Sequence, residues 1–191
     1  GGLTESVASM MTGKDLKKVF KLPDTTNMVN KVLIQRGHLT NYGAEVEQGI
    51  KLSGAKILKC GFKKFCTIEN IEKTISKNKN QIACAMYVVS HHCSDYGSLE
   101  LNSFIKICKK NKIPVIVDAA SEEYMEDFFK IGADVAIFSA HKFMGSLTAG
   151  IIAGKKKFIK NVYLQNLGIG RGMKVGKESI YSAIIGVENW Y

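Results

Sequence analysis

The sequence is poor in residues that interrupt or cross-link a chain. Its 191 residues include two prolines and two arginines, and its five cysteines have no regular spacing. An odd number of irregularly spaced cysteines argues against a disulfide framework, and the lack of a C-x-x-C pair argues against a zinc ribbon. No stretch reaches the roughly 18 apolar residues that a membrane span needs, and no basic and then apolar signal segment opens the chain. We therefore expect a reduced, cytoplasmic protein without a metal site.

Acidic residues are also scarce. The chain has 27 lysines and arginines but only 17 aspartates and glutamates, which gives a formal charge of +10. Such an excess is compatible with a nucleic-acid partner. Many lysines, however, lie in helix-like stretches such as 106–112, where charge is typical of a solvated helix face. We favour this second interpretation, and a basic pocket for an anionic substrate is compatible with both.

Short apolar runs alternate with amphipathic helical patterns along the whole chain. Near-continuous apolar strands are typical of a parallel sheet that is covered by helices on both faces. The sequence therefore predicts an α/β fold with a mostly parallel sheet flanked by helices. The predicted strands are 31–35, 55–60, 81–89, 114–117, 135–138 and 150–153, and the predicted helices are 3–11, 46–52, 68–75, 99–108 and 124–130.

Polar or ionisable residues follow four of the predicted strands. In parallel sheets, ligands bind beyond the carboxyl ends of the strands, so these residues are the first to consider for a site. They are Arg36 to His38, Ser90 to His92, Asp118 to Ala120, and Ser139 to Lys142.

Asp118 and Lys142 are the main candidates for chemistry. Asp118 is either a helix N-cap or a buried carboxylate that holds a cationic ring nitrogen, and position alone leaves both open. Lys142 is either a lysine that extends from an edge to solvent or an amine that forms a Schiff base. Ser139 could bind a phosphate oxygen, and His141 could do the same or cap the turn. Ser-x-x-Lys also occurs in serine β-lactamases, but the K-T-G box that accompanies it there is missing.

Two adjacent histidines, His91 and His92, follow the third predicted strand. Neighbouring side chains on a strand point to opposite faces, so we expect only one of them at the site. A ring that stacks on a flat cofactor is the functional interpretation, and a packed core histidine is the alternative. Together with Cys93 they suggest a metal, but three neighbours in a row do not easily converge on one ion.

A compact cationic group lies in the glycine-rich segment 168–177, with Arg171, Lys174 and Lys177 as its members. The glycines do not match G-x-G-x-x-G, and no strand precedes them in a βαβ unit, so a nucleotide fingerprint is not predicted. The group suits a phosphate or a carboxylate, for which arginine offers a bidentate fork. An ordinary basic loop before the last helix is the alternative.

An aspartate after one strand and a lysine after the next, in VDAA and SAHK, resemble the motifs of pyridoxal-phosphate enzymes of fold type I, the aspartate aminotransferase-like superfamily. The wider pattern is similar to the selenocysteine synthase (seryl-tRNA selenium transferase) group of that superfamily. Its RGH, SHH and MKVGKE segments are more specific than the two general motifs. The resemblance runs through LPDTTNMVNKVLIQRGH, NYGAEVEQGIKLSGAKI, YVVSHHCSDYG, IPVIVDAASEE, GADVAIFSAHK and GRGMKVGKESI.

This resemblance implies pyridoxal 5'-phosphate as the cofactor and a role for each candidate residue. Lys142 would carry the cofactor and act as a base, and Asp118 would keep the ring nitrogen protonated. His91, in preference to His92, would stack on the ring. The other residues expected at the cofactor are Ala120, Ser139 and His141. The residues expected at the carboxylate and phosphate of the substrate, some of them across the interface of a homodimer or higher homo-oligomer, are Arg36, His38, Tyr42, Arg171 and Lys174.

The implied activity is that of an ammonia-lyase. It would remove water and ammonia from an amino sugar acid phosphate such as D-glucosaminate 6-phosphate and leave a 2-keto-3-deoxy acid phosphate. Transfer of selenium to a seryl-tRNA is the alternative that the charge of +10 favours, and tRNA binding over a salt series would discriminate it. A cysteine desulfurase and an inactive fragment are further alternatives.

The resemblance also implies that residues 1–191 form part of a cofactor-binding large domain. Members of the group have a phosphate loop of small residues, of the Ser-Gly-Ala kind, before their first helix. This sequence begins inside or just past that loop, and we expect a small C-terminal domain to follow Tyr191.

Overall fold

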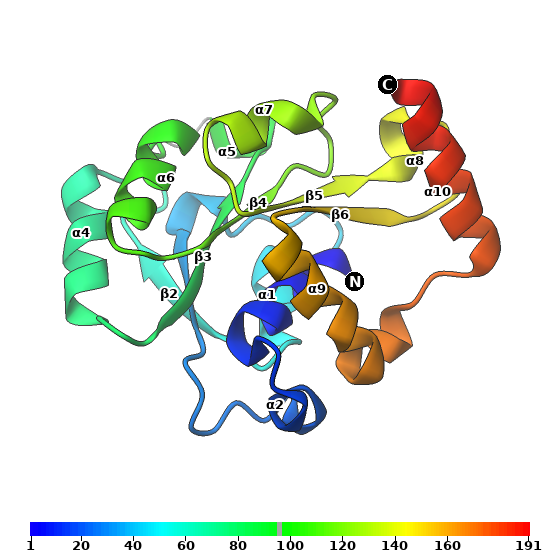
Figure 1. Ribbon diagram of the computed structural model, residues 1–191. Helices are drawn as coiled ribbons and strands as arrows, with labels where there is room; N and C mark the ends of the chain where they lie inside the picture. The colour runs from blue at the N-terminus through cyan, green and yellow to red at the C-terminus, as the bar shows by residue number, and fades with distance from the viewer. Residues whose placement is uncertain (95–96) are drawn as a thin grey trace.

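The computed structural model describes residues 1–94 and 97–191, and its centre is one six-stranded sheet (Figure 1). The strand order is β2-β1-β3-β4-β5-β6. Neighbours from β2 to β5 are parallel, and β6 pairs antiparallel with β5. The strands are β1 (Lys31–Gln35), β2 (Lys56–Cys60), β3 (Ile82–Val88), β4 (Val115–Asp118), β5 (Val135–Ser139) and β6 (Gly150–Gly154).

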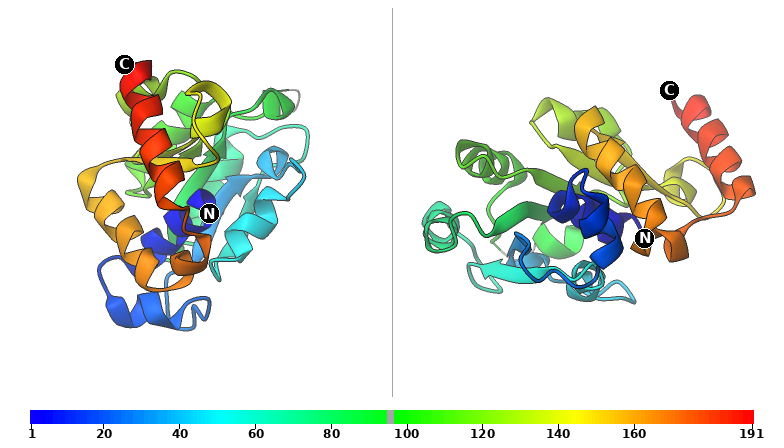
Figure 2. Two further views of the ribbon diagram at one scale, coloured as in Figure 1. Left: turned by 90° about the vertical axis from the view of Figure 1, so that its right-hand side faces the viewer. Right: turned by 60° about the horizontal axis from the view of Figure 1, so that its bottom comes forward.

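Helices lie on both faces of this sheet (Figure 2). No helix among the described residues is both long and apolar enough to cross a bilayer. The α-helices are α1 (Gly2–Thr12), α2 (Leu16–Lys21), α3 (Val46–Lys51), α4 (Ile68–Lys77), α5 (His91–Ser94), α6 (Leu101–Lys110), α7 (Met125–Lys130), α8 (Ala140–Phe143), α9 (Lys156–Leu164) and α10 (Lys177–Trp190). Three 3-10 turns are η1 (Arg36–His38), η2 (Gln165–Leu167) and η3 (Ile169–Met173).

Two hydrophobic cores, one on each face, explain why the central strands are largely apolar. Successive strand residues point to opposite faces of a sheet. Leu33 of β1 packs in the core that α4, α6 and α7 cover, whereas its neighbour Ile34 packs in the core that α1 and α3 cover. Val117 and Ile116 of β4 are divided in the same way. The predicted α/β fold with a mostly parallel sheet is thus confirmed.

The helices α2, α5, α8 and α9 were not predicted. The six residues of α2 are fewer than two turns, and the helix begins because the Asp15 carboxylate accepts bonds from the Lys17 and Lys18 amides. The first turn of α9 contains lysines and no acidic residue. It therefore lacks the sequence signal that usually marks a helix start.

The parallel orientation brings the carboxyl ends of β1 to β5 to one edge of the sheet. The short elements η1, α5 and α8 follow β1, β3 and β5 at this edge. Gly150, the first residue of β6, pairs with Ser139 at the end of β5, so the segment before β6 joins the same edge. The Ala140 amide donates to the Ala149 carbonyl at 3.0 Å and fixes α8 against that segment.

Candidate active site

Asp118 and Lys142 lie at the same edge of the sheet, after the neighbouring strands β4 and β5. Asp118 is the last residue of β4 and pairs in register with Ile137 of β5, whereas Lys142 lies in α8, which begins directly after β5. Burial raises the pKa of Asp118. A hydrogen bond from the Ala120 amide and the positive charge of Lys142 both lower the pKa and oppose that rise. The carboxylate therefore interacts electrostatically with the lysine across the site.

The Lys142 side chain is exposed and reaches back to the loop after β4. Its ammonium group donates a hydrogen bond to Ser121 Oγ at 2.5 Å. Among the described residues, neither Lys142 nor Asp118 forms an ion pair within 4.0 Å. The amine and the carboxylate therefore occupy one site without neutralising each other directly.

His91 and His92 begin the short helix α5, and their ring centroids are 3.9 Å apart. The prediction that they point to opposite faces of a strand is therefore wrong, because β3 ends at Val88 and the chain turns helical three residues later. His91 borders a hollow of about 450 Å³ together with Glu122, which follows Ser121 in the loop after β4. His91 and the loop that follows Asp118 thus border the same hollow.

Four other predicted site residues, Ser139, His141, Arg171 and Lys174, line a single cleft of about 730 Å³. Ser139 Oγ lies 3.1 Å from His141 Nδ1. Arg171 belongs to η3, which runs past the start of α1, as Figure 2 shows near the N-terminus. Glu5 of α1 lines the cleft as well, and burial raises the pKa of its carboxyl group. Arg171 and Lys174 of the cationic group are thus part of the cleft wall and suit a bound anion, whereas Lys177 is not among the lining residues.

Arg36 and Tyr42 lie after β1 and are not among the residues that line this cleft. Arg36 is exposed at the start of η1. The Tyr42 hydroxyl lies 3.8 Å from Cys93 Sγ, and the Tyr42 ring lies 5.8 Å from that of His92. Tyr42 therefore connects the loop after β1 with α5.

His38 occupies a different environment from the one that the sequence suggested. The side chain is fully buried, its Nδ1 accepts a hydrogen bond from the Val88 amide at 3.2 Å, and its ring meets Tyr87 edge-on at 4.3 Å. Its Nε2 has no hydrogen-bond partner among the described residues. A substrate-binding role does not fit this position, because the ring supports the end of β3 and presents no surface to a ligand.

The burial of His38 predicts an acid-sensitive stability. Burial lowers the pKa of His38 to about 4, whereas an unfolded histidine titrates near 6.5. As the pH falls from about 6.5 to about 4, the unfolded chain takes up a proton that the native chain does not, so the free energy of unfolding should fall by about 3 kcal/mol. His38→Asn keeps an acceptor for the Val88 amide and should reduce the loss of unfolding free energy between pH 7 and pH 4.5, as measured by urea unfolding at both pH values. An equal loss in the wild type and in His38→Asn would refute the prediction.

Sequence reasoning missed two residues that shape the site, Gln35 and Ser121. Gln35 is fully buried, and its amide group makes two hydrogen bonds with the Leu99 backbone, at 3.0 Å and 2.8 Å. A polar residue at the end of an apolar strand was the available signal, since buried polar groups need partners. Ser121 could have been noticed as a hydroxyl three residues after Asp118.

These residues fit pyridoxal phosphate. A cationic heterocycle with an aldehyde requires a carboxylate, an amine and a flat ring to cover it. The site offers the partly buried Asp118, which forms no ion pair among the described residues, Lys142 in the helix after the next strand, and the His91 imidazole at the hollow beside them. The neighbouring cleft offers a hydroxyl, an imidazole and two cations for phosphate. Fold and site together define the chain as part of a pyridoxal-phosphate enzyme of fold type I.

The chain belongs to the aminotransferase class-V family, whose model matches residues 30–182. It is 36% identical over 190 residues, all of this chain and 51% of the relative, to the D-glucosaminate-6-phosphate ammonia lyase of Salmonella typhimurium. A solved structure of D-glucosaminate-6-phosphate ammonia-lyase matches 99% of this chain and 50% of its own chain with a TM-score of 0.94. The L-seryl-tRNA(Sec) selenium transferase of Carboxydothermus hydrogenoformans is 26% identical over 78% of this chain and 35% of its own.

These similarities confirm the predicted family resemblance, fold and cofactor. The chain spans about half the length of the ammonia lyases it matches. The role of each residue remains a prediction.

Proposed function

We propose that the full-length protein is a pyridoxal-phosphate-dependent lyase that acts on a phosphorylated amino acid such as D-glucosaminate 6-phosphate. The proposal rests mainly on the position of Asp118 and Lys142 at the same edge of the sheet, beside a cleft that Arg171 and Lys174 line. The 36% identity to a D-glucosaminate-6-phosphate ammonia lyase supports this substrate class.

Each residue at the sheet edge has a distinct task in this reaction. When bound, pyridoxal phosphate supplies a sink for the electron pair that remains after the α-proton of the substrate has left. Asp118 would keep a proton on the ring nitrogen through its negative charge, and His91 would cover the ring. Lys142 would hold the cofactor, and its amine would take the α-proton of the substrate. Proton transfer by a positioned group of this kind typically contributes ~10²–10⁴-fold to the rate.

The cleft beside these residues would hold the anionic groups. Ser139 and His141 lie close to Lys142 in the chain and line the cleft, and they would bind the cofactor phosphate. Arg171 and Lys174, on the η3 side of the cleft, would bind the phosphate or the carboxylate of the substrate. The exposed Arg36 and Tyr42 are compatible with a site that a second copy of the chain completes in a homo-oligomer.

The overall reaction neither consumes nor releases water, because one molecule leaves and one is taken up. The substrate loses its α-proton and the hydroxyl group on C3, which together leave as water and create a carbon–carbon double bond next to the amine. The resulting enamine becomes an imine when its carbon takes up a proton. A water molecule then hydrolyses the imine, so that ammonia and a 2-keto-3-deoxy acid phosphate are the products.

Incubation of the full-length protein and pyridoxal phosphate with D-glucosaminate 6-phosphate tests this proposal. We expect ammonia and the keto acid in equal amounts, measured by coupled assay and by mass spectrometry. D-Glucosaminate without phosphate should show a kcat/KM at least about tenfold lower, since each lost charge-assisted hydrogen bond costs about 1.5–3 kcal/mol. A lack of ammonia would refute the activity. Equal kcat/KM values for both substrates would refute the cleft as the phosphate site.

A further inference from the structure

A serine that the proposed reaction does not itself require contacts the central lysine. Ser121 lies 21 positions before Lys142, and its Oγ accepts the hydrogen bond from Lys142 Nζ. Lys142 has no other hydrogen bond or ion pair among those found in the described part of the chain. The position of the amine therefore depends on this one hydroxyl group.

Main-chain hydrogen bonds fix both sides of the contact. The Ala119 amide donates to the Ile137 carbonyl of β5 at 2.9 Å, and the Glu122 amide donates to the Ala119 carbonyl at 3.1 Å, which closes the turn around Ser121. On the other side, Ala140 is tied to the segment before β6. The serine hydroxyl forms none of these bonds. Its removal should therefore leave the turn folded.

The neutral partner has a chemical consequence. Asp118 and Glu122 both lie in the same short stretch as Ser121, yet neither forms an ion pair with Lys142. A carboxylate would hold the ammonium proton through a full opposite charge, and the amine would have difficulty in giving up that proton. A hydroxyl accepts the hydrogen bond and orients the nitrogen without such a full opposite charge.

We propose that Ser121 is a positioning residue, which holds the Lys142 nitrogen in place during the steps in which this nitrogen is not attached to the cofactor. A lysine side chain loses rotamer entropy when it is ordered, and a fixed hydrogen-bond partner lowers the cost of ordering it at each turnover. This inference rests on the proposed function, since the lysine amine is freed and reused during that reaction.

Selective labelling of the full-length protein without cofactor tests the contact directly. Trace acetic anhydride acetylates amines, and mass spectrometry gives the labelling of Lys142 relative to the exposed and distant Lys112. Ser121→Ala should raise this ratio about three- to tenfold, because the ammonium form loses its hydrogen-bond partner. Ser121→Thr, which keeps the hydroxyl, should return the ratio to that of the wild type. An unchanged ratio in Ser121→Ala overturns the proposal.

Steady-state kinetics of the enzyme with cofactor form the second measurement. Ser121→Ala should lower kcat about tenfold with little change in KM, Ser121→Thr should restore kcat, and Ser76→Ala on the exposed face of α4 should match the wild type. A wild-type kcat in Ser121→Ala overturns the inference and leaves the proposed function intact. If the protein does not bind pyridoxal phosphate, the proposed function fails, and the labelling ratio still decides whether Ser121 holds the lysine.

Discussion

Replacement of Lys142 by alanine in the full-length protein should abolish both turnover and the visible absorbance of attached pyridoxal phosphate. The variant loses the nitrogen that holds the cofactor and also the base that takes the α-proton. Loss of the base alone should lower kcat by a factor of ~10²–10⁴. Absorbance spectra after addition of the cofactor, together with ammonia release, measure the two effects separately.

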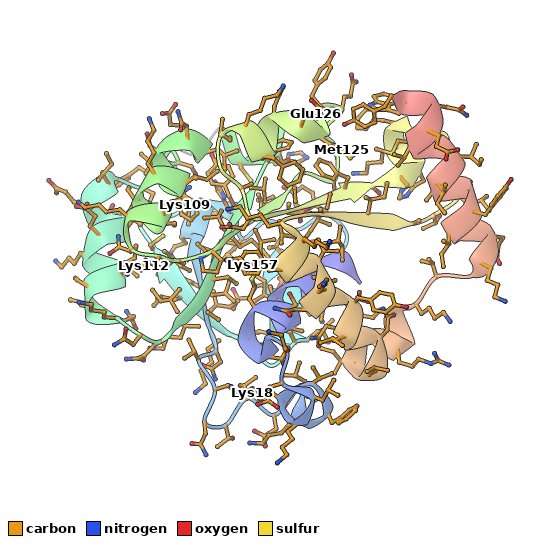
Figure 3. The ribbon with its side chains drawn as sticks, viewed as in Figure 1. Lys18, Lys109, Lys112, Met125, Glu126 and Lys157 are labelled. Carbon is orange, nitrogen blue, oxygen red and sulfur yellow. The ribbon has the colours of Figure 1, made fainter. Side chains whose placement is uncertain are left out.

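Two variants control for the loss of a lysine as such. Lys142→Arg keeps a positive charge beside Asp118 but cannot attach the cofactor, so it should be as inactive as Lys142→Ala. Lys157→Ala removes an exposed lysine of α9, which lies away from the loops after β4 and β5 (Figure 3), and should leave the spectrum and the activity unchanged. Visible absorbance that persists in Lys142→Ala would show that another group carries the cofactor.

Replacement of Asp118 by asparagine should have the second largest effect. Asparagine has nearly the same shape and can still accept the hydrogen bond from the Ala120 amide, but it has no charge for a protonated ring nitrogen. A charge-assisted hydrogen bond contributes about 1.5–3 kcal/mol, so the Kd for pyridoxal phosphate should rise roughly 10- to 100-fold. Turnover should decrease as well at saturating cofactor, because the ring nitrogen is no longer kept protonated.

Fluorescence titration with pyridoxal phosphate measures this Kd. Asp127→Asn is a suitable control, since Asp127 lies in α7, a few residues beyond the same loop, and forms an ion pair with the exposed Lys130. It should bind the cofactor like the wild type. An unchanged Kd and kcat in Asp118→Asn would contradict a role at the ring nitrogen and would favour the interpretation of Asp118 as a turn-capping residue.

Much of the fold follows from local sequence patterns. The six strands could be predicted because both sheet faces are covered, which requires apolar residues at nearly every strand position. The four-residue helices α5 and α8 could not be predicted, because a single turn shows no helical periodicity. The error for His91 and His92 has the same origin. The strand β3 ends at Val88, and the two histidines lie in one turn of helix instead of on a strand, so their side chains do not point to opposite faces.

The site could be predicted only in part. The sequence identified Asp118 and Lys142 as candidates, but each had an ordinary structural interpretation, and their proximity depends on the pairing of β4 with β5. The family resemblance implied a substrate-binding role for His38, whereas its ring turns inward to the Val88 amide. The contact of Ser121 with Lys142 joins two loops, and no local pattern in either loop reveals it.

Reduction of the enzyme–cofactor complex with borohydride, followed by peptide mapping, tests the central claim most directly. The reagent fixes pyridoxal phosphate to the lysine that carries it, and mass spectrometry then identifies that residue. We expect one modified position, Lys142, in the peptide that contains IFSAHK. Modification at any other lysine, or none at all, would contradict the pairing of Asp118 with Lys142 around one cofactor.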